Sequence, residues 1–397
     1  MIRWPGRQRH LVAVCILAGL FYGLSLVFDD VRGLSLAMIT HTPRDLFNTQ
    51  ATLRSENKAS SPDALDVGHD SDTVQEGSVP PQPVGDGTAN ATMVFLARNS
   101  DLDGVLSSMG HVEERFNKKY GYPWVFLNEV EFTDEFKERV TSATSAPVSF
   151  GLIPREHWYQ PDWIDEDKAR MGREKMEAQK IIYADSVPYR NMCRFNSGFF
   201  FQHPLLRPYK YYWRVEPGIE YTCDVTYDPF DYMRDHDKVY GFTISFTEWE
   251  PTIPTLWQTV QEFIELYSQY VSENNAMRYL SDNGGKTYNL CHFWSNFEIA
   301  DMDFWRGEAY QKFFEFLESK GGFYYERWGD APVHSIAVAL FAPRDKIHFF
   351  NDVGYRHPPF EHCPKGEARS RKNCNCDPKQ SLDYFPQSCI PRYERLW

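Results

Sequence analysis

The chain has 397 residues, a formal net charge of −13 and an aromatic content of 16%. This length is enough for one large domain or two ordinary ones. The acidic balance argues against a nucleic-acid partner, because phosphate backbones are bound by basic surfaces. The 23 Tyr and 11 Trp residues are typical of a large core or of a cleft that binds sugars or nucleosides.

An uncharged apolar run, residues 11–28, follows three arginines near the N-terminus. A helix of about 20 apolar residues spans a bilayer, and the arginine-rich side stays cytoplasmic. We therefore expect residues 1–10 to form a cytoplasmic tail and residues 11–28 a transmembrane signal anchor, which makes a single-pass type II membrane protein. A cleaved signal peptide is the alternative, but the run exceeds the usual signal-peptide core and no clear cleavage site follows it.

Residues 29–90 have a different composition, with ten acidic and four basic side chains and one aromatic residue, Phe47. Such a segment cannot bury enough apolar surface to offset its chain entropy, so we interpret it as a flexible lumenal stem. Asn90 begins the only N-glycosylation motif of the sequence, which agrees with a lumenal location.

Residues 91–397 contain 58 of the 63 aromatic residues and are predicted to form one folded unit. Seven of the eight cysteines lie in this unit, and an oxidising lumen favours pairing of some of them, with at least one left over. Cys374, Cys376 and Cys389, with Cys363 nearby, indicate disulfides rather than a zinc site, because no second cysteine pair stands at the usual zinc spacing.

The unit begins with a strand, a helix and a second strand, the order that opens an α/β nucleotide-binding layer. The strands are expected at 92–98 and 122–129, and the helix carries an apolar stripe from Val105 to Phe116. No glycine-rich phosphate loop follows the first strand, so a dinucleotide-binding or P-loop protein is disfavoured. Further elements predicted from the pattern are a strand at 238–246, a helix with Thr252 at its N-cap, and helices at 303–319 and 331–341.

Five segments combine polar residues with dense aromatic residues, and each alone has a structural explanation. Arg214 and Glu216 form either an ion pair or a ligand site at a strand end, since Pro217 and Gly218 stop the strand there. Asp330 is explained as a helix N-cap and His334 as a core histidine with satisfied hydrogen bonds. The segments are VPYRNMCRFNSGFF (187–200), YYWRVEPGIEYTCD (211–224), TYNLCHFWSNFEIADMDFW (287–305), YERWGDAPVHSIAVALF (325–341) and HFFNDVGYRHPPFEHCP (348–364).

Together these segments closely resemble the fungal Golgi α-1,2-mannosyltransferases of glycosyltransferase family 15. The resemblance covers residues 91–397 and includes YNLCHFWSNFEIA and YERWGDAPVHSIA almost unchanged. It implies an α/β fold of the GT-A type, a Rossmann-like α/β/α sandwich behind an N-terminal transmembrane helix. It also implies a Golgi membrane location with a lumenal catalytic domain.

The resemblance further implies a retaining transfer from GDP-mannose that depends on Mn²⁺. Family members lack the usual DxD motif, so the glutamate of VEP, Glu216, would bind the metal together with His357. Where some members have an acidic residue after VEP, this chain has Gly218, which bears on the acceptor. The remaining implied roles are catalytic for Glu298, as candidate nucleophile, and Tyr189, and nucleotide-binding for Arg98, Arg214 and Asp330.

The expected reaction moves mannose to the 2-hydroxyl of a mannose acceptor on O-linked or N-linked glycans of glycoproteins. A divalent ion and arginines can stabilise the departing diphosphate without an acid catalyst. Retention leaves two mechanisms open, attack by a carboxylate or departure and attack on the same face. Two alternative functions are a non-catalytic sugar-binding Golgi subunit, expected to lack one of the three key residues Glu216, Glu298 and His357, and a retaining glycoside hydrolase, which would not bind GDP-mannose.

Overall fold

A seven-stranded sheet is the centre of the computed structural model, which describes residues 88–397. Strand β9 runs antiparallel to both of its neighbours, and the other pairings in this sheet are parallel. The strand order is β10 (Ile347–Phe349), β6 (Tyr240–Phe242), β9 (Glu298–Asp301), β4 (Tyr211–Val215), β1 (Ala91–Leu96), β2 (Trp124–Asn128) and β3 (Val148–Leu152).

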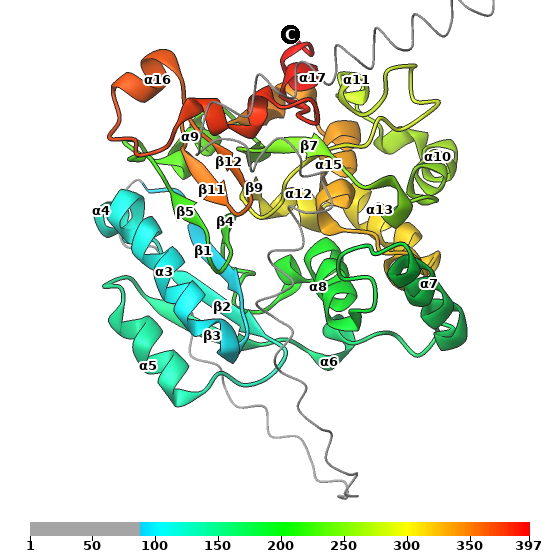
Figure 1. The fold of residues 1–397 in the computed structure, drawn as a ribbon, viewed down its shortest axis with the longest axis horizontal. Helices are drawn as coiled ribbons and strands as arrows, with labels where there is room; N and C mark the ends of the chain where they lie inside the picture. The colour runs from blue at the N-terminus through cyan, green and yellow to red at the C-terminus, as the bar shows by residue number, and fades with distance from the viewer. Residues whose placement is uncertain (1–87) are drawn as a thin grey trace, which may run out of the picture. The chain divides into compact units, whose positions relative to one another are not determined.

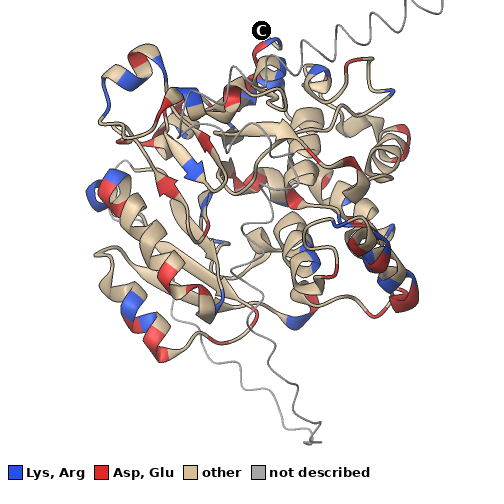
Figure 2. Ribbon diagram, in the orientation of Figure 1, with Lys and Arg blue, Asp and Glu red and all other residues tan. Residues whose placement is uncertain are grey.

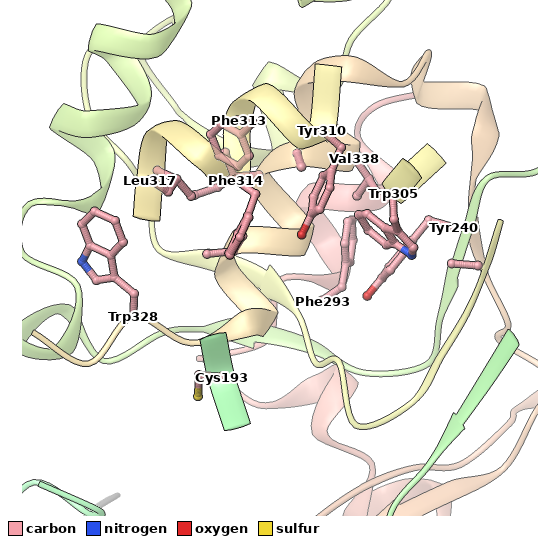
Figure 3. Packing of buried hydrophobic residues seen from close by; sticks show 14 of the residues in the cluster. Cys193, Tyr240, Phe293, Trp305, Tyr310, Phe313, Phe314, Leu317, Trp328 and Val338 are labelled. Carbon is pink, nitrogen blue, oxygen red and sulfur yellow. The ribbon is translucent and has the colours of Figure 1, made fainter. Parts of the chain in front are cut away.

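Helices cover both faces of this sheet, because successive side chains of a strand point to opposite faces and both sets are apolar. Met93 and Phe95 of β1 pack with Val105 of α3, whereas Val94 belongs to a second core cluster that includes Ile336 of α15. Figure 1 shows the two helix layers, and Figure 3 shows the aromatic packing of the second cluster. The predicted α/β/α sandwich is therefore confirmed. The layers contain α3 (Leu102–Val112) and α5 (Asp134–Ser142) on one face, and α8 (Val187–Gly198), α12 (Met302–Arg306), α13 (Glu308–Ser319) and α15 (Asp330–Phe341) on the other.

Two smaller sheets form separately from the central sheet. One has the order β12-β11-β5, and the other pairs β7 with β8. Their bounds are β5 (Glu220–Tyr221), β7 (Ser245–Thr247), β8 (Cys291–Phe293), β11 (Tyr355–His357) and β12 (Phe360–His362).

Two predicted elements differ from the structure in how the chain is divided, and a third agrees with it. The strand expected at 238–246 is two strands, because after Phe242 the chain leaves the central sheet and Ile244 accepts a hydrogen bond from Trp294 instead. The helix expected at 303–319 is interrupted by Gly307, whose extended backbone (φ −65°, ψ 150°) separates α12 from α13. The predicted helix at 331–341 is confirmed as α15.

Two predicted helix caps are wrong. The Thr252 hydroxyl donates to the carbonyl of Trp249 in a short 3₁₀ turn, so the helix α10 (Leu256–Leu266) begins after Thr255 instead. Asp330 is the first residue of α15 rather than its cap, which is Gly329, because its carboxylate is engaged by other side chains described below.

Three disulfides confirm the interpretation of the cysteines. Cys223 pairs with Cys374, Cys291 with Cys389, and Cys363 with Cys376. The seventh cysteine, Cys193, is unpaired and buried.

The predicted tail and signal anchor, residues 1–28, and nearly all of the predicted stem lie outside the described residues. Within residues 88–397, no helix is both long enough and apolar enough to cross a membrane. Asn90 of the glycosylation motif is exposed, immediately before β1.

Candidate active site

The carboxyl edge of the central sheet gathers most of the candidate residues. Strands β1 and β4 are parallel and end together, so Arg98 follows one and Glu216 follows the other. Because β9 is antiparallel to β4, Glu298 at its start lies in register with Arg214. Figure 2 shows charged residues concentrated on outer helices such as α5 and α7 (Glu166–Ala178). In α/β sheets this edge is where ligands bind.

Arg214 joins two carboxylates at this edge. Its Nε and Nη2 donate to Oε1 of Glu216 at 3.0 and 2.5 Å, and its Nη1 donates to Oδ2 of Asp330 at 2.5 Å. The same Asp330 oxygen accepts from the Ser295 hydroxyl at 2.8 Å. The ion pair between Arg214 and Glu216 is therefore real, but two carboxylates share one guanidinium. The cluster has an excess of one negative charge, which favours a nearby cation.

His357 approaches Glu216 from the small sheet. Strand β5 pairs with β11, so the turn after Glu216 brings the end of β11 back over that carboxylate. The His357 Nε2 lies 3.5 Å from Oε2 of Glu216, while Nδ1 is 3.2 Å from the carbonyl oxygen of Pro358. A carbonyl only accepts, so Nδ1 carries a proton in this contact, and Nε2 is the ring nitrogen that points toward Glu216. This is the arrangement of a metal-binding histidine oriented by a backbone carbonyl.

The charge state of Glu216 agrees with a ligand role. Burial raises the pKa of Glu216, but Arg214 and His357 outweigh that effect and hold the pKa at about 2. The carboxylate is therefore ionised throughout the physiological range. A carboxylate oxygen and an imidazole nitrogen form a donor set that suits Mn²⁺. Among residues 88–397, no group of three or more His, Cys, Asp or Glu side chains forms a complete metal cage.

Helix α3 holds the turn that carries Glu216. The buried Ser108 hydroxyl donates to the Glu216 carbonyl at 2.8 Å and accepts from the Ile219 amide at 3.1 Å. The amide of Gly218 also donates to the carbonyl of Gly104 at 3.3 Å. Gly218 has φ +82°, a left-handed conformation that glycine adopts without strain. Sequence reasoning missed Ser108, since nothing distinguishes this serine from others on an amphipathic helix.

Glu298 is completely buried in a network of side chains. Its Oε1 accepts from the Tyr212 hydroxyl at 2.6 Å, and its Oε2 accepts from the Tyr240 hydroxyl at 3.0 Å. His334 Nδ1 lies 3.1 Å from the same Oε2, and its Nε2 lies 3.0 Å from the carbonyl of Asn196. Side chains therefore satisfy this carboxylate, and His334 is confirmed as a core histidine with hydrogen-bond partners.

Two further candidate residues, Tyr189 and Arg98, come from helix α8 and from the turn after β1. Tyr189, near the start of α8, stacks on Tyr183 with ring centres 4.5 Å apart, and burial raises its pKa well above the ordinary value. Arg98 is largely exposed and lies 3.6 Å from Glu129. Arg327, whose guanidinium lies 5.1 Å from the centre of the Tyr189 ring, was not singled out from the sequence, although it belongs to the motif YERWGD.

Comparison with known proteins agrees with this arrangement. The family model described as glycolipid 2-alpha-mannosyltransferase matches residues 47–396. Glycolipid 2-alpha-mannosyltransferase 1 of Candida albicans is 58% identical over 307 residues, which cover 77% of this chain and 71% of the relative.

Two solved structures share the mixed α/β glycosyltransferase fold. Core-mannan synthase A of Aspergillus fumigatus, in its Mn/GDP form, is 42% identical with a TM-score of 0.74, covering 79% of this chain and 87% of its own. The mannosyltransferase Ktr4p of Saccharomyces cerevisiae in complex with GDP is 39% identical with a TM-score of 0.75, covering 94% and 96%. The chain therefore belongs to the glycolipid 2-alpha-mannosyltransferase family, glycosyltransferase family 15, a family of α-1,2-mannosyltransferases.

Proposed function

We propose that this chain transfers mannose from GDP-mannose, with retention, to the 2-hydroxyl of a mannose acceptor on O-linked or N-linked glycans of glycoproteins. The observation that carries the proposal is the pair formed by Glu216 and His357. A carboxylate oxygen and an imidazole nitrogen face each other 3.5 Å apart at the carboxyl edge of the sheet. The Aspergillus relative, which shares this fold, was solved with Mn and GDP.

Glu216 and His357 would hold Mn²⁺, with diphosphate oxygens and water as the remaining ligands. When bound, the ion supplies positive charge to the diphosphate as it leaves. Arg214 fixes the Glu216 carboxylate through two hydrogen bonds and positions Asp330 with a third. Arg98, which follows β1 at the same edge, is exposed enough to reach the nucleotide. Arg98 thus keeps the nucleotide-binding role expected from the sequence, whereas Arg214 and Asp330 act through the proposed metal ligand.

We assign same-face departure and attack to the reaction. The bond between the anomeric carbon and the diphosphate breaks with its electron pair on the leaving oxygen. The acceptor oxygen forms the new bond on that face, and its proton passes to the leaving diphosphate. Glu298 supports positive charge on the sugar ring rather than attacking it, because it is fully buried and both of its oxygens accept hydrogen bonds. Tyr189 stays protonated because burial raises its pKa, which leaves its hydroxyl as a donor for the substrate.

The proposal includes a place in the cell. Residues 11–28 would anchor the protein in the Golgi membrane as a single-pass type II protein, and residues 29–90 would act as a stem. The three disulfides support a lumenal catalytic domain, since disulfides persist in oxidising compartments. The GT-A subtype of the fold is part of the same proposal.

The test is to incubate the protein with GDP-mannose, Mn²⁺ and a panel of mannosides and to determine the linkage of the product. We expect an α-1,2-linked mannoside and loss of product when the metal is chelated. Release of free mannose without transfer would instead support the hydrolase, and binding without turnover would support a non-catalytic subunit.

A further inference from the structure

Arg327 is a nearly buried arginine whose charge has no carboxylate partner among residues 88–397. The residue is 8% exposed, and its Nε lacks a hydrogen-bond acceptor. No carboxylate among residues 88–397 lies within ion-pair distance of its guanidinium. Burying an unpaired charge is costly, so proteins seldom keep one without a function for it.

Arg190, on the neighbouring helix α8, shows how this fold treats a buried arginine with a structural role. It is completely buried, yet its Nε donates to the carbonyl of Glu326 at 3.1 Å. Its Nη1 donates to the carbonyls of Tyr183 and Ser186 at 3.3 and 3.1 Å. Arg190 thus donates hydrogen bonds to three backbone carbonyls, whereas the side chain of Arg327 donates to none among residues 88–397.

The backbone and the ring of a neighbour fix the position of Arg327. Its amide donates to the carbonyl of Thr252 at 3.0 Å, and its guanidinium lies 5.1 Å from the centre of the Tyr189 ring. Asp330, the residue that Arg214 holds, follows three positions later at the start of α15. The unpaired charge therefore belongs to the same group of residues as the candidate catalytic tyrosine.

The charges at the sheet edge are not balanced, so a further cation would be stabilised there. Arg214 is shared by Glu216 and Asp330, which gives that cluster an excess of negative charge. A divalent cation offsets the excess, but Arg214 has little charge left for an incoming diphosphate. A guanidinium presents five N–H donors in a fixed fork that matches phosphoryl oxygens.

We propose that Arg327 is a further substrate-binding residue that pairs with the diphosphate of the donor and stabilises the charge left on it when the sugar bond breaks. This inference rests on the proposed function, in which the mannoside acceptor is neutral and the donor is the anionic reactant. An oxyanion would satisfy the guanidinium that the protein leaves unpaired.

The test compares Arg327→Met with Arg190→Met. In the absence of ligand, Arg327→Met should melt at or above the wild-type temperature, because it removes a buried charge that nothing in the protein pairs. Its dissociation constant for GDP in the presence of Mn²⁺ should rise about tenfold or more, the value of a charge-assisted hydrogen bond. Arg190→Met should melt at a lower temperature, since three carbonyls lose their donor, and the folded fraction should bind GDP as the wild type does.

Arg327→Lys sharpens the result, because it keeps the charge but not the fork and should restore GDP affinity only in part. Two outcomes overturn the inference. Arg327→Met melts well below the wild type with GDP affinity unchanged, which makes the residue structural. Alternatively, only the KM for the mannoside rises, which makes it an acceptor residue.

Glu216→Gln in the same assay separates this inference from the proposed function. If Glu216→Gln leaves Mn²⁺-dependent GDP binding unchanged, the proposed metal site is wrong whatever Arg327 does. If Glu216→Gln abolishes that binding and Arg327→Met does not weaken it, only the role of Arg327 is wrong.

Discussion

Two glutamates stand at the same edge of the same pair of strands, Glu216 at the end of β4 and Glu298 at the start of β9. Glu216 is held by charges and keeps a quarter of its side chain exposed. Glu298 is held mainly by hydroxyl groups and is completely buried. The resemblance implies a metal-binding role for Glu216 and a catalytic role for Glu298. Their different surroundings are consistent with the two different roles proposed above.

The substitution with the largest expected effect is Glu216→Gln. The amide keeps the volume but loses the charge that binds Mn²⁺, so we expect metal-dependent transfer to fall by at least about a hundredfold with the fold intact. The measurement is activity across a Mn²⁺ titration, with thermal melts in parallel. Glu220→Gln is a matched control, because Glu220 pairs with Arg356 across β5 and β11 and lies outside the metal pair. A normal Mn²⁺ response in Glu216→Gln would mean that Glu216, like Glu298, does not bind the metal.

Glu298→Gln should cost both stability and turnover. An amide nitrogen cannot accept the hydroxyl hydrogen that the carboxylate accepted, so a buried donor is left unsatisfied at a cost of about 2–3 kcal/mol. We expect a lower melting temperature and a reduced kcat, with little change in GDP affinity.

Azide addition to Glu298→Ala tests the mechanism directly. A covalent nucleophile requires rescue with formation of a mannosyl azide of inverted configuration, and we expect none. Recovery of turnover by azide would show that Glu298 reaches the sugar after all.

Ser108→Ala should act on the metal site through the turn of Glu216. Losing the hydroxyl frees the Glu216 carbonyl and the Ile219 amide, at a cost of about 1–2 kcal/mol. We expect Mn²⁺ affinity to weaken, as measured by the loss of the free-Mn²⁺ electron paramagnetic resonance signal, and excess Mn²⁺ to restore kcat.

The control for Ser108 is Ser335→Ala. Ser335 is equally buried, accepts from the Phe293 amide at 2.7 Å and donates to the Ala331 carbonyl at 2.6 Å. Its loss should lower the melting temperature similarly while Mn²⁺ affinity stays constant. Equal weakening of Mn²⁺ binding in both variants would deny Ser108 a specific role.

The prediction with the smallest effect on mannose transfer at neutral pH concerns the stability of the fold in acid. Burial, with Lys238 adding to it, lowers the pKa of His348 to about 4. The unfolded chain takes up this proton below its ordinary pKa of about 6.5 and the folded chain does not, so stability falls as the pH drops from 6.5 toward 4. We expect a loss of about 2–3 kcal/mol over this window, which His348→Phe should reduce. Glu216 adds to the loss only below about pH 5, because its pKa of about 2 in the folded chain lies below the ordinary value of 4.5.

Much of the fold could be predicted because it follows from local patterns. The first strand, helix and strand were identified from apolar periodicity, and the disulfides from the clustering of cysteines near the C-terminus. The division after Phe242 could not be predicted, because Ile244 bonds to Trp294, which is far away in the sequence. The break at Gly307 and the failed cap at Thr252 are local: glycine favours helices little, and the Thr252 hydroxyl is used within a tight turn.

The site was predictable to the extent that motifs carry it. Glu216 and His357 were identified through VEP and GYRHPP, and the structure brings them within 3.5 Å. The hydroxyl groups around Glu298 come from Tyr212 and Tyr240, 86 and 58 residues away, so no local pattern announces them. Arg327 was missed for another reason: nothing in the motif YERWGD shows that this arginine has no acidic partner in the folded chain.

The disulfides carry a consequence for how the enzyme matures. Cys223, just after β5, and Cys363, just after β12, are each joined to a cysteine of the C-terminal tail, and Cys291 of β8 is joined to Cys389. The small sheet that presents His357 is thus stapled to a segment that follows it in the chain. The proposed metal ligand is locked in place only after that segment has been made and an oxidising compartment has closed the bonds. Positioning of His357 is therefore coupled to oxidation of the protein.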